Sequence, residues 1–161
     1  AKKSAGRGSK ICTGFQSVGL ISEIFDVYRA EAEQLGILVG PDDIGLRRNV
    51  SVAEDESDAK EAARIALETT QKLVADDPRV SADSSSMIDL PKGGSSFSLH
   101  EDEFISGTPD QVAEQIIHQC RTCGAGHFLA ILGRASRNKR PGLISMFGTE
   151  VVPKLRQAEF V

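Results

Sequence analysis

Residues 107–132 read GTPDQVAEQIIHQCRTCGAGHFLAIL, and this stretch decides the fold class of the chain. Its first residues are typical of a helix start, because Thr108 can accept an unpaired backbone N–H, Pro109 suits the first helical position and Gln111 can reach back as in a capping box. Apolar residues then recur at helical spacing up to a glycine-containing turn at 123–126. The apolar run HFLAIL at 127–132 follows, and such a run after a helix predicts a strand buried on both faces.

The same alternation of strand and helix extends over the rest of the chain. We expect a strand at 10–15 and a second at 44–53, which is polar in its middle. Each is followed by a helix; Ser57 is expected to cap the second of these, which should end near residues 76–78. The apolar stripe of the first helix comprises Leu20, Ile21, Ile24, Val27 and Tyr28, and the small-residue face of the second comprises Ala59, Ala62, Ala63, Ala66 and Leu67. This order predicts an α/β fold of βα units.

Several segments of the chain also resemble one protein family. GTPDQVAEQ at 107–115, GHFL at 126–129 and LISMFGTEVVPKLR at 143–156 are similar, in order and spacing, to the end of the bacterial-luciferase-like monooxygenases. YRAEAEQLG at 28–36 and PDDI at 41–44 resemble a helix and the start of the penultimate strand in that family. The resemblance is weakest at 79–103. It implies a TIM barrel and an oxidoreductase, with FMN as reduced flavin or the deazaflavin F420 as cofactor.

The length of the chain limits how much of a barrel it can form. A TIM barrel has eight strand–helix units in about 250 residues, whereas we find three such units from Lys10 onward. Residues 1–161 are therefore expected to be the C-terminal portion of a single (β/α)8 barrel domain, incomplete in this chain, with a flexible insertion at about 79–103. The expected partner is the missing N-terminal half of the barrel or another chain, and the intact protein is expected to be a homo-oligomer.

The resemblance implies the chemistry of the intact protein. A monooxygenase of this family is a flavoprotein that oxygenates a small organic substrate with reduced flavin and O2, while the relatives that use F420 transfer hydride. The fragment alone should be inactive, because most elements that contact flavin in the family lie in the missing half.

Composition and charge exclude some other functions. The formal net charge is −4, which argues against a nucleic-acid partner because affinity for the phosphate backbone needs clustered lysine and arginine. No apolar stretch approaches the roughly 20 residues needed to span a membrane, and three cysteines make a poor disulfide framework. We therefore expect a cytoplasmic protein with no membrane partner.

Candidate site residues follow from barrel geometry, because active sites of barrels lie at the C-terminal ends of the strands. Gly133 and Arg134 directly follow the last predicted strand and begin a basic loop, so they are predicted to bind a cofactor phosphate or an acidic substrate. A solvated basic loop is the alternative interpretation. Phe15 and Ser17 lie at the end of the first predicted strand and are also candidates for cofactor binding; a core position is the alternative interpretation of Phe15. His100 is a weak candidate for a proton donor, and no other catalytic residue is assigned.

Two further functions are compatible with the residues. The alternative to an enzyme is a non-enzymatic truncated α/β interaction module that self-associates or pairs with another polypeptide, because a fold alone does not establish chemistry. Cys120 and Cys123 form a C-x-x-C pair near His118 and His127, which raises a zinc or dithiol site. We expect no metal there, because the pair lies at a helix C-terminus, where the helix dipole opposes a thiolate.

Overall fold

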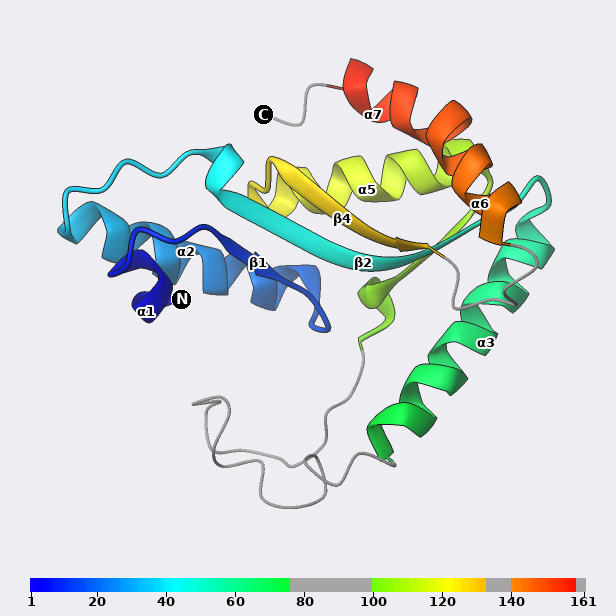
Figure 1. Ribbon diagram of the computed structural model, residues 1–161, viewed down its shortest axis with the longest axis horizontal. Helices are drawn as coiled ribbons and strands as arrows, with labels where there is room; N and C mark the ends of the chain where they lie inside the picture. Colours follow the sequence, from blue (N-terminus) through cyan, green and yellow to red (C-terminus); the bar gives the residue numbers. More distant parts are fainter. Residues whose placement is uncertain (76–99, 133–139, 159–161) are drawn as a thin grey trace.

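The computed structural model describes residues 1–75, 100–132 and 140–158, which form one parallel β-sheet with helices packed around it (Figure 1). Gly133, Arg134 and most of the predicted insertion, residues 76–99, lie outside the described residues. The strands are β1 (Ile11–Thr13), β2 (Ile44–Val52), β3 (Phe104–Gly107) and β4 (His127–Leu132). The helices are α1 (Lys2–Ala5), α2 (Val18–Gln34), α3 (Glu56–Ala75), α5 (Pro109–Cys123), α6 (Arg140–Met146) and α7 (Val152–Gln157). Short 3-10 turns η1 (Pro41–Asp43) and η2 (Glu101–Glu103) precede β2 and β3, and the π-helical segment η3 (Phe147–Val151) joins α6 to α7.

Strand β2 is the centre of the sheet and pairs in parallel with all three other strands. Strand β4 pairs with residues 45–50 of β2 along one edge. Strand β1 pairs with residues 44–46 and β3 with residues 49–52. Both ranges overlap the range that pairs with β4, so β1 and β3 must lie on the other edge of β2. Between these two partners, Arg47 and Arg48 have no strand partner on that edge. This two-residue gap in the sheet is where the polar cluster described below lies.

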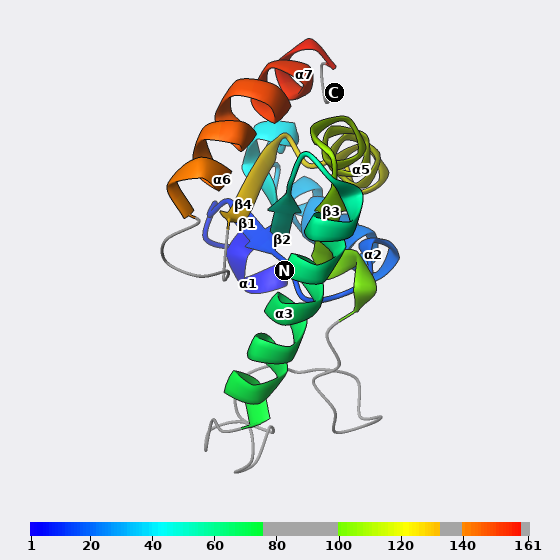
Figure 2. The same ribbon diagram turned by 90° about the vertical axis from the view of Figure 1, so that its right-hand side faces the viewer.

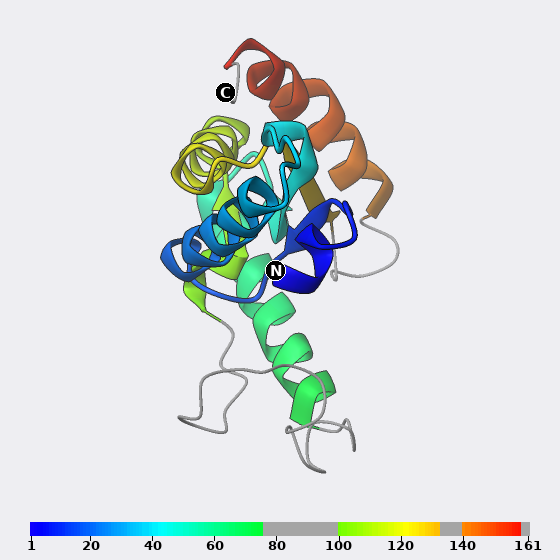
Figure 3. The same cartoon turned by 90° about the vertical axis from the view of Figure 1, so that its left-hand side faces the viewer.

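The helices occupy both sides of the sheet. In Figures 2 and 3, α2 and α5 lie together on one side of the strands and α6 on the other, while α7 returns to pack on α5. The hydrophobic core joins the two helices α2 and α5 to β2, and its fully buried members include Phe25, Ile44, Leu46 and Ile116. A mixed α/β architecture with a parallel sheet is thus confirmed.

The predictions for α5 are confirmed in detail. The side-chain oxygen of Gln111 accepts the backbone N–H of Thr108 at 2.9 Å, which is one arm of the predicted capping box. The helix ends at Gly124, whose φ of +65° is the left-handed conformation of a C-terminal cap. Of the residues whose helical spacing predicted a buried stripe, Val112, Ile116 and Cys120 are buried and Ile117 is half-buried.

Other predictions need correction. Strand β4 is not buried on both faces, because His127 is exposed and Leu129 is 54% exposed. In α2, Leu20 and Val27 are exposed, and Phe25 and Ala32 take core positions instead. The β3 strand was not predicted, because four residues are too few for a periodic pattern to stand out.

The start of α3 also differs from the prediction, although its small-residue face is confirmed by the burial of Ala59 and Ala66. Asp55, not Ser57, caps the helix: its Oδ1 accepts the backbone N–H of Ser57 at 2.7 Å and the hydroxyl of Ser57 at 2.5 Å. These hydrogen bonds lower the pKa of Asp55. Aspartate is as good a cap as serine, and it directly precedes the helix here.

Candidate functional site

The β1–α2 turn carries the two described residues that were predicted to bind a cofactor, Phe15 and Ser17. Ser17 caps α2, and its Oγ accepts the backbone N–H of Leu20 at 3.2 Å. Phe15 has φ of +70°, and it is the only non-glycine residue with positive φ in the part of the chain that the structure describes. This conformation costs roughly 1–3 kcal/mol for a bulky residue, so the surrounding contacts must hold it.

Contacts with Glu103 and Arg47 help to hold Phe15. Its backbone N–H donates to Glu103 Oε2 at 2.7 Å, and its ring centroid lies 3.9 Å from the guanidinium carbon of Arg47. A guanidinium over an aromatic face at this distance is a favourable cation–π contact. The β1–α2 turn is thereby tied to both β2 and the segment that leads into β3.

Glu103 is the centre of the cluster and is fully buried. Besides the Phe15 N–H, its carboxylate accepts Arg47 Nη1 at 2.5 Å, Asn49 Nδ2 at 2.8 Å and Arg48 Nη1 at 3.3 Å. Adjacent strand residues point to opposite faces, so Arg47 and Arg48 can meet one carboxylate only from the edge of β2. Glu103 therefore fills the gap between β1 and β3.

Arg48 is the second fully buried charge in this cluster. Its Nε donates to the side-chain oxygen of Gln119 on α5 at 2.7 Å. Burial lowers the pKa of Arg48 and Glu103 opposes that shift. Two buried atoms, Arg48 Nη2 and Asn49 Oδ1, have no hydrogen-bond partner among the described residues. A donor and an acceptor are thus left unused beside a buried ion pair, where unpaired polar atoms are costly.

Asp102 and His100 lie next to this cluster along the chain. Asp102 Oδ2 accepts the backbone N–H of Val18 at 2.8 Å, so a carboxylate sits at the positive end of α2. The ring Nδ1 of His100 accepts the backbone N–H of Asp102 at 3.2 Å and lies 3.4 Å from its Oδ2. The structure thus gives His100 a capping contact on η2, and the hydrogen bonds given for the Glu103 carboxylate do not include the His100 ring.

Sequence reasoning missed Glu103 and the three side chains that donate to its carboxylate, which are those of Arg47, Arg48 and Asn49. The available signal was the Arg-Arg-Asn run in the middle of a predicted strand, because buried charges need partners. The partner itself was not visible, since Glu103 is more than 50 residues away in sequence from each of them.

The C-x-x-C pair lies in the core and does not show the features of a reactive thiol pair. Cys120 and Cys123 are both buried free thiols. Burial raises the pKa of Cys120 to about 12 and also raises that of Cys123, which disfavours the thiolate that metal binding or disulfide exchange requires. Among the described residues, no three His, Cys, Asp or Glu side chains are grouped as metal ligands.

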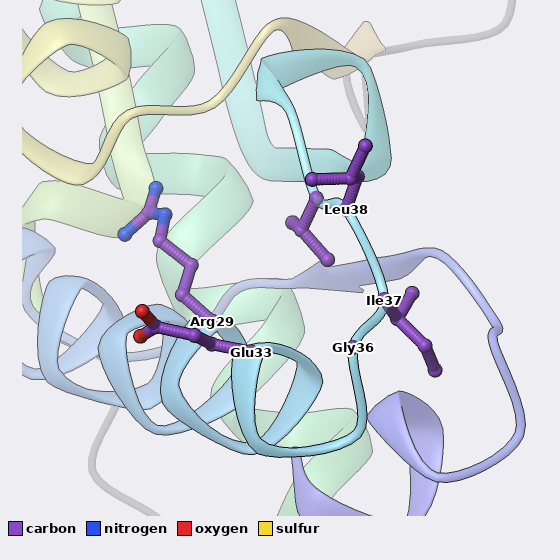
Figure 4. Close-up of a pocket in the computed structure, with 6 residues that line it drawn as sticks. Arg29, Glu33, Gly36, Ile37 and Leu38 are labelled. Carbon is purple, nitrogen blue, oxygen red and sulfur yellow. The ribbon is translucent and has the colours of Figure 1, made fainter.

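A surface pocket of about 340 Å³ lies at the opposite end of the sheet from Phe15 (Figure 4). It is bounded by Arg29 and Glu33 of α2 and by residues 36–39, which lead into η1 and β2. Arg29 Nη2 donates to the carbonyl oxygens of Cys123 at 2.8 Å and Gly124 at 3.2 Å. In barrel enzymes this N-terminal end of the strands serves stability, and the site is at the other end. We therefore place the candidate site at the Phe15–Arg47–Glu103 cluster.

Comparisons with known proteins agree with this architecture. No family model matches the sequence, and no curated protein matches it. Solved structures match it in fold. A monooxygenase from Streptomyces bottropensis has 18% sequence identity and a TM-score of 0.66, and the match covers 94% of this chain and 44% of the monooxygenase chain. The oxygenating constituent of 3,6-diketocamphane monooxygenase from Pseudomonas putida, solved with FMN, has 19% identity and a TM-score of 0.65 over 96% of this chain and 45% of its own.

An F420-dependent tetrahydromethanopterin reductase from Methanopyrus kandleri also shares the fold, with 18% identity and a TM-score of 0.58 over 96% of this chain and 47% of its own. The resemblance predicted from the sequence is confirmed at the level of fold, because the matching structures include monooxygenases, one of them solved with FMN, and an F420-dependent reductase. The chain spans less than half the length of these relatives. No helix in the described ranges is long and apolar enough to cross a membrane.

Proposed function

We propose that this chain forms the C-terminal βα units of an oxidoreductase barrel that works with reduced flavin or F420. The observation that carries the proposal is the fold shared with monooxygenases and an F420-dependent reductase over more than nine-tenths of the chain. In the proposed whole protein, the remaining units of the barrel come from an N-terminal half or from a partner chain, and the barrel is a cytoplasmic homo-oligomer.

The candidate site has side chains that suit a flavin or deazaflavin. Phe15 offers an aromatic surface, Arg47 offers a cation, and the buried Asn49 Oδ1 and Arg48 Nη2 retain unused hydrogen-bonding capacity. We assign Phe15 and Ser17 to the wall of the cofactor site, and Gly133 and Arg134 to its phosphate or acidic tail. When bound, the cofactor would supply electrons for oxygenation by O2 or for hydride transfer, and this chain's residues would bind it, orient it and exclude water.

FMN is the first choice of cofactor and F420 the second, because both occur among proteins that share this fold. The substrate of the proposed enzyme is a small organic molecule. His100 remains a weak candidate for a proton donor, since its exposed ring is next to the cluster along the chain.

The first experiment is intact and native mass spectrometry of the purified protein, combined with an absorbance spectrum. A longer chain or a co-purifying N-terminal polypeptide with a flavin or deazaflavin spectrum supports the proposal. A colourless 17.3 kDa species that unfolds cooperatively, and binds neither cofactor when titrated with FMN or F420, contradicts it.

The second candidate function is an interaction module that self-associates or pairs with another polypeptide. Within the described ranges, β1 and β4 each pair only with β2, so the outer edge of each has no strand partner. Unpaired edges are templates for strand addition. Light scattering of the cofactor-free protein distinguishes the two functions: a stable oligomer without cofactor affinity favours the module.

A further inference from the structure

Arg47 is held in position before any ligand arrives. Its Nη1 is 2.5 Å from the buried Glu103 Oε1, and its guanidinium carbon lies over the Phe15 ring at 3.9 Å. A planar guanidinium fixed on an aromatic face and by one ion pair has lost most of its rotamer freedom. A ligand that binds it does not have to order the side chain, which favours affinity.

The guanidinium still has donors to offer. It carries five N–H bonds, and among the described residues only Nη1 makes a hydrogen bond. The side chain is 14% exposed, and Leu129, which is its register partner on β4, is 54% exposed. Gly45 precedes Arg47 by two residues and lies on the same face of β2, where Cys12 of β1 occupies the space, since an added Cβ on Gly45 would lie 3.2 Å from the Cys12 sulfur. Access for a ligand to Arg47 is therefore on the side of Leu129, where the Arg47 side chain is partly exposed.

The direct ion pairs of the cluster leave donors for an anion. Two guanidinium groups, those of Arg47 and Arg48, share the single carboxylate of Glu103. The neighbouring carboxylate of Asp102 is directed to the Val18 N–H at the start of α2, where the helix dipole is positive. Asp102 also acts on Arg48 through space, so it is by direct contact alone that the two guanidinium groups share one carboxylate, which leaves donors of Arg47 for an anion.

The strain at Phe15 gives an independent reason to regard this geometry as functional. A phenylalanine at φ of +70° is costly, and such strain is concentrated at ligand sites. Here the strained residue is the one whose ring supports Arg47 and whose N–H is bound by Glu103.

We infer that Arg47 binds an anionic ligand group, a phosphate monoester or a carboxylate, at the partly exposed position that it shares with Leu129 of β4. This inference rests on the proposed function for the origin of the group, which is either the phosphate of the cofactor or a carboxylate of the substrate. Arginine suits both, because its planar donors match two oxygens at once.

The test is the side-chain Nε–Hε NMR signal of Arg47 in the full 161-residue chain, assigned with Arg47→Lys. Inorganic phosphate and acetate are titrated first, and then FMN and riboflavin, which differ only by the phosphate. Arg64→Lys is the matched control, because Arg64 is an exposed arginine of α3 that pairs with Glu61 and Glu68. Circular dichroism checks that both variants are folded.

We expect phosphate to shift the Arg47 signal, and FMN to bind about tenfold to a hundredfold more tightly than riboflavin, with the difference reduced in Arg47→Lys and kept in Arg64→Lys. A shift with acetate alone, and equal affinities for both flavins, supports a substrate carboxylate.

If neither anion moves the signal and Arg47→Lys leaves FMN binding unchanged, the inference is wrong. If an anion shifts the Arg47 signal but neither flavin nor F420 binds, the anion site is supported and the proposed function is wrong. If FMN and riboflavin bind equally and no anion shifts the signal, the proposed function is supported and the anion site is wrong. If Arg47→Lys does not fold, the anion titrations of the wild-type protein test the inference. The Arg47 signal is then assigned as the arginine Nε–Hε signal that shifts in Phe15→Leu.

Discussion

Glu103 Oε1 lies 2.5 Å from Arg47 Nη1, although the two residues are 56 positions apart in the sequence. The same carboxylate binds the fully buried Arg48, so it closes the gap in the sheet that β1 and β3 leave along β2. The stability of the sheet edge and the geometry of the candidate site therefore depend on one side chain.

Glu103→Gln should strongly destabilise the protein. The change removes the only carboxylate that pairs with Arg48 among the described residues and leaves a buried guanidinium uncompensated, which typically costs about 3–5 kcal/mol. Urea unfolding followed by circular dichroism measures the loss. Glu61→Gln is the matched control, because Glu61 is an exposed partner of Arg64 and should hardly change the midpoint. Equal midpoints for the two variants would show that the buried cluster contributes little.

Strain at Phe15 predicts an unusual order of stabilities. Phe15→Gly should be about 1 kcal/mol more stable than Phe15→Ala, because both lose the ring but only glycine adopts positive φ without cost. At Val27, an exposed position in α2, the order should reverse, with Val27→Ala about 1 kcal/mol more stable than Val27→Gly. Chemical unfolding of the four variants tests this. Alanine ahead of glycine at both positions would contradict strain at Phe15.

Features that depend on near neighbours were predictable from the sequence. The capping box of Thr108 and Gln111 and the glycine cap at Gly124 involve residues only a few positions apart, and both are present. The position of β4 was predicted correctly, but its burial on both faces was not. An apolar run shows that its residues are suited to burial, whereas burial also requires another element to cover them.

The candidate site was only half predictable, for a related reason. Barrel geometry led to Phe15 and Ser17, since the end of a strand can be located from the sequence. The backbone conformation of Phe15 and its contact with Glu103, which is 88 residues away, arise from packing. No local pattern marks a buried carboxylate in the turn before a four-residue strand, so Glu103 and its arginines emerged only from the structure.

Stability should fall at high pH because of Cys120. Burial raises the pKa of this thiol from an ordinary value of 9.0 to about 12, so the folded state holds the proton more tightly than the unfolded state. The contribution is complete below about pH 9 and is lost as the pH rises toward 12. The free energy of unfolding of wild type relative to Cys120→Ala, measured under reducing conditions from pH 7 to 10.5, should therefore shrink with pH. A constant difference would mean that the thiol is not buried in this way.

Arg134→Ala should weaken ligand binding in the intact barrel. We propose that Arg134 contacts the phosphate of the cofactor or an acidic substrate, and loss of such a charged hydrogen bond lowers affinity by about tenfold or more. Fluorescence titration with FMN and initial rates with substrate measure the two affinities. Lys139→Ala, at the far end of the same basic loop, is the control for a general charge effect. Unchanged affinity for both ligands would remove Arg134 from the site.

Two glycine-to-alanine changes should have opposite effects on stability. A Cβ on Gly126 would lie 2.7 Å from the carbonyl carbon of Pro41, and the Gly126 N–H donates to the Pro41 oxygen at 2.9 Å. The α5–β4 turn is thus packed directly on η1, and Gly126→Ala should cost about 1–3 kcal/mol by overpacking. Gly142 lies in α6 with nothing within 4 Å of an added Cβ, so Gly142→Ala should stabilise by up to about 1 kcal/mol. Thermal unfolding measures both effects. A lower Tm for Gly126→Ala with a higher Tm for Gly142→Ala supports the close approach of the turn to η1, and an unchanged Tm for Gly126→Ala contradicts it.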